Sequence, residues 1–212
     1  FGKWVDNKLI KDTQELPPSV KTEIKQITAD ATSSVEKAKL VYQYMQNKTR
    51  YISVQVGIGG WKPMLASDVD RLGYGDCKAL TNYTKALLDE VGVDSYYTLI
   101  YGGKNIENID KDFSTTQGNH AILAVPNNDD YIWLECTNQT VPFGYNANFT
   151  DDRDALIITP EGGKIVHTKV YETKDNTLTT TAKVKLDDKG SIFADVNIVS
   201  KGSQYNYHSR LE

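Results

Sequence analysis

A cysteine, a histidine and a glutamate follow one another along the chain in an order that suits nucleophilic catalysis: Cys77, His120 and Glu135. Cys77 comes directly after Gly75 and Asp76 and directly before a stretch with apolar residues at helical spacing. Asp76 is a suitable N-cap, which places Cys77 in the first helical turn. The positive end of the helix dipole favours the thiolate, which is the nucleophilic form. We therefore predict that Cys77 is a reactive thiol; the alternative is a buried cysteine that packs as a small apolar residue.

His120 and Glu135 lie on either side of a predicted β-turn. The segments that contain them are rich in β-branched and aromatic residues, and the residues between them are typical of turns. If the turn is centred between Asn127 and Asn128, His120 lies directly opposite Glu135. Directly opposed residues of an antiparallel pair share a face, with Cβ atoms about 5 Å apart. Glu135 is therefore predicted to orient the imidazole of His120, as the acid of a nucleophilic triad does.

These motifs resemble a known family. The segment Tyr74–Lys78, the His120 segment, and an acid that follows Trp-x on the next strand are similar to those of the transglutaminase-like superfamily of papain-type cysteine enzymes. The lead-in 57–63, Gly-Ile-Gly-Gly-Trp-Lys-Pro, is similar to that of a bacterial cell-envelope branch with β-domains before and after the core. The resemblance covers residues 20–170. Two positions depart from the family pattern, because Glu135 stands where Asp is usual and Ala79 stands where Asp often follows Cys-Lys.

The resemblance implies an α+β fold, in which the helix of the nucleophile packs on an antiparallel sheet. It implies a cysteine enzyme of acyl transfer that hydrolyses or transamidates amide bonds of a protein or peptide, with no cofactor. It also implies a periplasmic or extracellular location at the cell envelope. A superfamily member that keeps the fold as a non-catalytic binding or structural module is the alternative, because function belongs to sites rather than to folds.

The backbone N–H of Cys77 is the first candidate donor to an oxyanion. Two residues that come earlier in the chain are candidates for the second donor. Gln55 and Trp61 flank the glycine-rich loop, and the side chain of each donates a hydrogen bond. The alternative is that Trp61 packs and that Gln55 is an exposed strand residue.

Composition excludes several other classes of function. The 212 residues carry a net charge of −4 without a long basic run, which argues against a nucleic-acid partner. No stretch approaches the roughly 18–20 apolar residues that span a bilayer. The chain has neither Cys-x-x-Cys nor paired histidines at helical spacing, so no metal site is predicted. Both cysteines are expected to be free thiols, because strand alternation turns Cys136 to the opposite side of the sheet from Glu135.

Periodicity and turn residues divide the chain into three parts. Residues 1–18 are predicted to be an N-terminal arm or linker, and residues 19–172 to be the transglutaminase-like core. Residues 173–212 are predicted to hold a β-hairpin that begins a C-terminal β-domain, truncated in a chain that we expect to be a fragment. Within the core we predict three helices: one over 19–29, one from Ser34 after a capping box (Ser33 with Glu36), and one over 77–91. Strands are predicted at 51–56, 95–101, 118–125, 131–137, 156–158 and 165–167. The polar loop 102–118 is predicted to form a wall of the substrate cleft.

Overall fold

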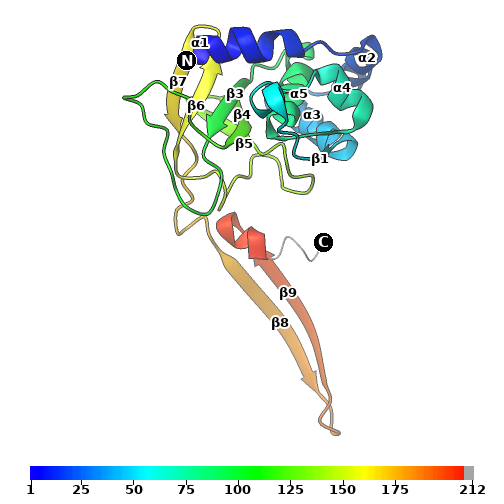
Figure 1. The fold of residues 1–212 in the computed structure, drawn as a ribbon. Coiled ribbons are helices and arrows are strands. Elements are labelled where there is room, and N and C mark those ends of the chain that lie inside the picture. Colours follow the sequence, from blue (N-terminus) through cyan, green and yellow to red (C-terminus); the bar gives the residue numbers. More distant parts are fainter. Residues whose placement is uncertain (208–212) are drawn as a thin grey trace. The chain divides into compact units, whose positions relative to one another are not determined.

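The computed structural model describes residues 1–207, and its contacts divide the chain into two compact units, Phe1–Lys169 and Val170–Glu212. The first unit has an α+β fold, as predicted from the sequence. Its strands and helices are shown in Figure 1. The helices are α1 (Gly2–Val5), α2 (Pro18–Ile27), α3 (Ser34–Lys48), α4 (Ala66–Leu72) and α5 (Cys77–Glu90), with shorter helical segments η1 (Asp6–Ile10), η2 (Lys11–Thr13) and η3 (Gly57–Gly60).

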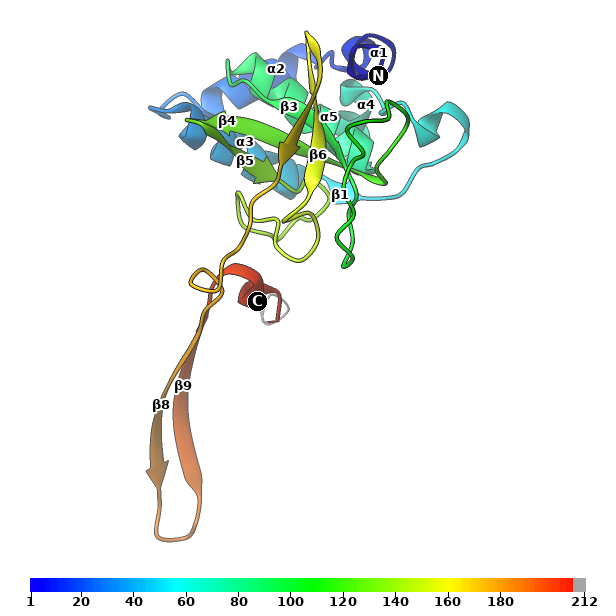
Figure 2. The same ribbon diagram turned by 90° about the vertical axis from the view of Figure 1, so that its left-hand side faces the viewer.

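The centre of the first unit is an antiparallel sheet of five strands in the order β5-β4-β3-β6-β7. Its strands are β3 (Tyr96–Ile100), β4 (His120–Asn127), β5 (Asp130–Leu134), β6 (Asp154–Thr159) and β7 (Gly162–His167). The two predicted hairpins, β4–β5 and β6–β7, are both present. The loop between β3 and β4 leaves the sheet and turns back to it, as Figure 2 shows.

The main hydrophobic core lies between the helices and one face of β4 and β5. Buried side chains of α2, α3, α4 and α5 pack there against Leu123, Val125 and Leu134. Cys136 belongs to the same cluster and is fully buried, as predicted for a packing residue. Both cysteines are free thiols. A second cluster, which includes Ile122 and Trp133, covers the opposite face.

Helix α5 begins at Cys77 because Asp76 caps it. The Asp76 carboxylate accepts a hydrogen bond from the backbone N–H of Ala79 at 3.0 Å, which is the predicted N-cap arrangement. Gly75 is needed just before the cap, since a Cβ atom at this position would lie 2.7 Å from the Cβ atom of Ala79. The capping box of α3, formed by Ser33 and Glu36, is also confirmed.

The strand predicted at 51–56 is almost absent. Only Arg50–Tyr51 forms β1, which pairs in parallel with β2 (Tyr74–Gly75). The pairing ends there because the partner segment turns into the cap of α5 one residue later. Residues 52–56 therefore belong to a loop, and Gln55 of this loop lines the same pocket as Cys77.

The N-terminal segment is helical rather than an extended arm. α1 packs against β6 and β7, and Val5, Leu9 and Ile10 are buried. Residues Asp6–Ile10 are wound as a π-helix, so the apolar positions do not follow the ordinary helical period that sequence patterns detect. The N-terminal segment is thus part of the wall of the first unit.

The second unit contains the predicted hairpin, formed by β8 (Leu178–Leu186) and β9 (Ile192–Ser200) with a turn at 187–191, followed by a short helix η4 (Gly202–Tyr207). That this hairpin opens a further β-domain stays a prediction, as do the domain boundaries. Over residues 1–207, no helix combines the length and the apolar composition needed to cross a membrane.

Candidate active site

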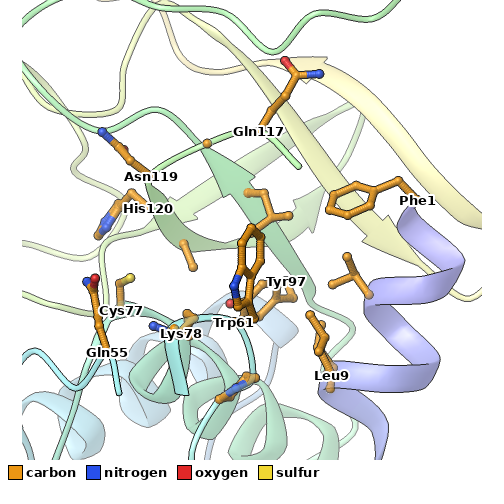
Figure 3. Close-up of a pocket in the computed structure, with 17 residues that line it drawn as sticks. Phe1, Leu9, Gln55, Trp61, Cys77, Lys78, Tyr97, Gln117, Asn119 and His120 are labelled. Carbon is orange, nitrogen blue, oxygen red and sulfur yellow. The ribbon is translucent and has the colours of Figure 1, made fainter. Parts of the chain in front are cut away.

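A pocket of about 350 Å³ opens beside the first turn of α5 (Figure 3). Cys77 and His120 line one part of it, together with Gln55 and Asn119. The apolar part is formed by side chains from the N-terminal segment and from β3, namely Phe1, Val5, Leu9, Ile10, Tyr97 and Leu99. The pocket thus combines a thiol and an imidazole with an apolar wall.

Helix α5 is fastened to the strand that carries the histidine. The hydroxyl of Thr81, one turn after Cys77, donates to the backbone carbonyl of Ala121 at 3.1 Å. Ala121 directly follows His120, so this bond fixes the position of the first turn of α5, and with it Cys77, relative to His120. In Figure 3 the thiol of Cys77 points toward the ring of His120.

His120 and Glu135 are in direct contact. The Nε2 atom of His120 lies 2.8 Å from Oε2 of Glu135, and both side chains are more than nine-tenths buried. Since Nε2 donates to the carboxylate, Nδ1 is the ring nitrogen available to the thiol of Cys77. This division of the two ring nitrogens is the one that a nucleophile–base–acid arrangement requires.

The predicted register that led to this contact is wrong by two residues. The hairpin turns at Asn128 and Asp129, Ala124 pairs with Trp133, and β5 ends at Leu134. If the ladder continued, Glu135 would face Ile122 and would lie diagonal to His120. A shift by two keeps the same face, because side chains alternate with a period of two. Diagonal neighbours are about 7–8 Å apart at the backbone, within reach of a long side chain. Glu135 is one methylene longer than Asp and makes this contact with His120.

Three further groups hold Glu135 in place. The backbone N–H and the hydroxyl of Thr137 both donate to Oε1 of Glu135, at 3.0 and 2.5 Å. The phenol of Tyr42, on α3, donates to the backbone carbonyl of Glu135 at 2.8 Å. Neither Thr137 nor Tyr42 was predicted from the sequence. The short spacing from Glu135 to Thr137 is a detectable signal, whereas the contact with Tyr42 depends on tertiary packing.

The buried pair shifts the protonation equilibria of both partners. Burial lowers the pKa of His120, but the charge of Glu135 and hydrogen bonds with Cys77 and Glu135 outweigh it and raise the pKa to about 10. Burial raises the pKa of Glu135, yet the charge of His120 and the donors of His120 and Thr137 leave it lowered overall. The pair therefore favours imidazolium and carboxylate, and the imidazole is a strong acceptor for a thiol proton.

At the second cysteine, Cys136, burial favours the neutral thiol. It raises the pKa of Cys136 to about 12, despite hydrogen bonds with Thr84 and Thr81 that lower it. The two thiols thus occupy different environments, one at a pocket and one in the core.

Gln55 and Trp61 both line the pocket, as their candidacy requires. The side-chain amide of Gln55 points toward His120 beside Cys77 in Figure 3. Trp61 is about half exposed, at 52%, and lines the pocket instead of packing in the core. Gln55 is not a strand residue but part of the exposed segment 52–56.

The polar loop 102–118 borders the pocket through Gln117 and Gly118. Arg153, which is fully buried, donates from Nη1 to the carbonyl oxygens of Tyr101 and Gly103 at 2.8 and 3.2 Å. Gly118 has a φ of +87°, and a Cβ atom there would lie 3.0 Å from the carbonyl oxygen of Ile100. The chain therefore requires glycine where the loop re-enters the sheet, two residues before His120.

An aromatic residue that the sequence analysis did not identify covers the imidazole. The ring of Phe149 meets that of His120 edge to face, with centroids 5.1 Å apart. Gly102 lies beneath both, since a Cβ atom there would be 3.0 Å from Phe149 and 3.1 Å from His120. No group of three or more His, Cys, Asp or Glu side chains in residues 1–207 is arranged to hold a metal ion.

No family model matches the chain, and no curated protein matches it. Among solved structures, a putative protease from Parabacteroides distasonis is similar with a TM-score of 0.56 at 14% identity, over 79% of this chain and 31% of that one. A putative cysteine protease from Cytophaga hutchinsonii is similar with a TM-score of 0.46 at 13% identity, over 90% of this chain and 55% of that one. The chain thus spans about a third to a half of the length of these structures. The first of them shows that this chain shares an α+β fold with a known structure.

Proposed function

We propose that this protein is a cysteine enzyme of the transglutaminase-like superfamily that hydrolyses amide bonds in peptides or proteins. The observation that carries the proposal is the buried contact between His120 and Glu135, 2.8 Å long, beside a cysteine at the start of a capped helix. The fold shared with a putative protease supports the same class of reaction. We place the protein at the cell envelope, outside the cytoplasm, on the family resemblance of its motifs.

In the first step, Nδ1 of His120 takes the thiol proton of Cys77. The result is a thiolate–imidazolium pair, which the carboxylate of Glu135 stabilises through Nε2. The N-terminus of α5 adds a favourable partial charge for the thiolate. The raised pKa of His120 makes this proton transfer favourable.

In the second step, the thiolate attacks the carbonyl carbon of the substrate amide. A C–S bond forms, and the developing oxyanion accepts hydrogen bonds from the backbone N–H of Cys77 and the side-chain amide of Gln55. The first donor is free of an intrahelical acceptor because Cys77 is the first residue of α5. The C–N bond then breaks, and the amine leaves with the proton that His120 carried.

The thioester is resolved when His120 accepts a proton from water and the hydroxyl oxygen attacks the acyl carbon. The C–S bond then breaks, the carboxylic acid leaves, and the thiolate of Cys77 and the imidazolium of His120 are regenerated. Gln55 and Trp61, which line the pocket, are both exposed, so this part of the pocket is open to water. An amine in place of water would give transamidation through the same residues. We assign hydrolysis on this access for water.

The test is the rate of iodoacetamide alkylation as a function of pH, followed separately at Cys77 and Cys136 by peptide mapping. We expect Cys77 to react at pH 6, where an ordinary thiol with a pKa of about 8.5 is almost fully protonated. His120→Ala removes this reactivity, whereas His167→Ala leaves it unchanged, because His167 lies in β7 and outside the pocket.

If Cys77 reacts only at high pH, as Cys136 does, the chain carries no activated thiol and the non-catalytic module becomes the better assignment. A peptide library incubated with and without an amine donor then distinguishes the two reactions of an active thiol. Amine-linked product without cleavage would replace hydrolysis by transamidation.

A further inference from the structure

The lining of the pocket has an unusual balance of charge. The chain has 28 acidic residues, yet no aspartate or glutamate is among the described residues that line this pocket. One lysine, Lys78, lines it directly beside the nucleophile (Figure 3). Lys78 is therefore the one lysine or arginine side chain among the described lining residues, and no carboxylate side chain lines the pocket beside it.

Lys78 is held rigidly at this position. Its side chain is only 11% exposed, and its ammonium group forms an ion pair with the carboxylate of Asp76. The other oxygen of the same carboxylate accepts the N–H of Ala79 at the start of α5. Asp76 itself is buried and does not line the pocket, whereas Lys78 does.

The ammonium group has hydrogen-bonding capacity to spare. A lysine carries three N–H donors, and within residues 1–207 Asp76 is the side chain that accepts from Lys78. Polar side chains also line the pocket, but within residues 1–207 none of them accepts a hydrogen bond from Lys78; they are Gln55, Tyr97, Gln117 and Asn119. A buried cation with unused donors at the edge of an apolar pocket is suited to an anionic ligand.

We propose that Lys78 binds a carboxylate of the acyl donor and that the enzyme selects substrates with a carboxylate close to the scissile amide. This inference rests on the proposed function of Cys77, because it assigns the substrate class of the same site. Cys77 and Lys78 are adjacent in the first turn of α5, so the carboxylate belongs to a residue that flanks the scissile bond. It is either the C-terminal carboxylate of a peptide or an acidic side chain.

The test compares two alkylating reagents of similar size, iodoacetate, which carries a carboxylate, and iodoacetamide, which is neutral. The quantity measured is the ratio of their alkylation rates at Cys77, at one pH and one ionic strength. The ratio cancels any change in the fraction of thiolate, which affects both reagents equally. A carboxylate bound by Lys78 raises the ratio, and Lys78→Met lowers it about tenfold, which corresponds to about 1.4 kcal/mol.

Matched variants separate recognition from general effects of charge and folding. Lys62→Met removes a lysine nearby in sequence that is paired with Asp12 and does not line the pocket, so we expect it to leave the ratio unchanged. Lys78→Arg keeps the charge and is expected to keep most of the ratio. Lys78→Met alone leaves Asp76 buried without its partner, so the double variant Asp76→Asn with Lys78→Met is measured beside it.

A competition experiment on the unaltered protein is independent of whether any variant folds. Propionate is expected to slow the alkylation of Cys77 by iodoacetamide, and propionamide is expected not to. Equal effects of the two competitors, or a ratio that stays within about twofold in a folded variant without Lys78, would overturn the assignment of Lys78. Either result leaves the proposed function intact as long as Cys77 still reacts at pH 6.

Two peptide-like probes identify the source of the carboxylate. Iodoacetyl-glycine carries a C-terminal carboxylate, and iodoacetyl-glutamic acid α-amide carries one on a side chain. Each is compared with its neutral amide. The pair with the larger ratio identifies the source, and two ratios of one would refute carboxylate recognition.

Discussion

Replacing Glu135 by Gln tests the acid of the proposed triad with little change in shape. Thr137 donates two hydrogen bonds to Oε1, and this fixes the oxygen of the substituted amide on the side of Thr137. The NH2 group of Gln then faces Nε2 of His120. Because a donor now meets this nitrogen, the imidazole must carry its proton on Nδ1, where it can no longer accept the proton of Cys77.

The expected size of the effect follows from the bond that is lost. A hydrogen bond to a charged group contributes about 1.5–3 kcal/mol, and 1.36 kcal/mol corresponds to a factor of ten. The burial of both side chains keeps solvent from weakening this interaction. We therefore expect the alkylation rate of Cys77 at pH 6 to fall about 10- to 150-fold in the Glu135→Gln variant.

The assay is iodoacetamide alkylation at pH 6, with the modified Cys77 peptide quantified by mass spectrometry. Glu161→Gln is the matched control, since Glu161 lies exposed in the turn between β6 and β7. Circular dichroism verifies that both variants are folded. A wild-type rate in folded Glu135→Gln would refute the assignment of Glu135 as the orienting acid.

Four further predictions concern the same unit. Glu135→Asp, which shortens a side chain that reaches diagonally, is expected to lower the alkylation rate at least about tenfold; an unchanged rate would show that the extra methylene is not needed. Because the pKa of His120 is raised from 6.5 to about 10, its protonation stabilises the folded state fully below pH 6.5, and this contribution is lost as the pH rises toward about 10. Urea unfolding at pH 6.5 and 9.5 measures the difference in the free energy of unfolding, and His120→Ala is expected to reduce that difference. Cys136 is expected to stay unmodified in the folded protein at pH 9, because its pKa is raised to about 12, and rapid labelling there would contradict its burial. Tyr42→Phe leaves the carbonyl of Glu135 without its donor and is expected to lower the free energy of unfolding by about 1–3 kcal/mol, with an unchanged value counting against that bond.

Helix caps and tight turns were predictable from the sequence, because residues close together in the chain determine them. The cap at Asp76, the start of α5 at Cys77 and the turn between β6 and β7 depend on residues within a few positions of one another. The sides occupied by Glu135 and Cys136 were also predictable, because strand alternation depends only on parity.

Features that depend on distant partners were not predictable in this way. The register of β4 and β5 is set by which turn residues adopt a left-handed conformation, and Asn128 does so with a φ of 55°. The length of β1 is set by β2, a strand of two residues about 24 positions later. The N-terminal wall of the pocket is formed by α1 and the π-helix Asp6–Ile10, whose apolar side chains cluster with residues of the sheet, and no periodic pattern marks it.

The bonds of Arg153 to the loop between β3 and β4 have a thermodynamic consequence for ligand binding. Besides these bonds, Asn119 exchanges two hydrogen bonds with Gly102, and Gln117 accepts from the N–H of Asp110 at 2.7 Å. This side of the cleft is therefore ordered when the protein folds and not when a ligand arrives. Binding then loses little chain entropy, and its heat-capacity change should reflect only the apolar surface that the ligand covers.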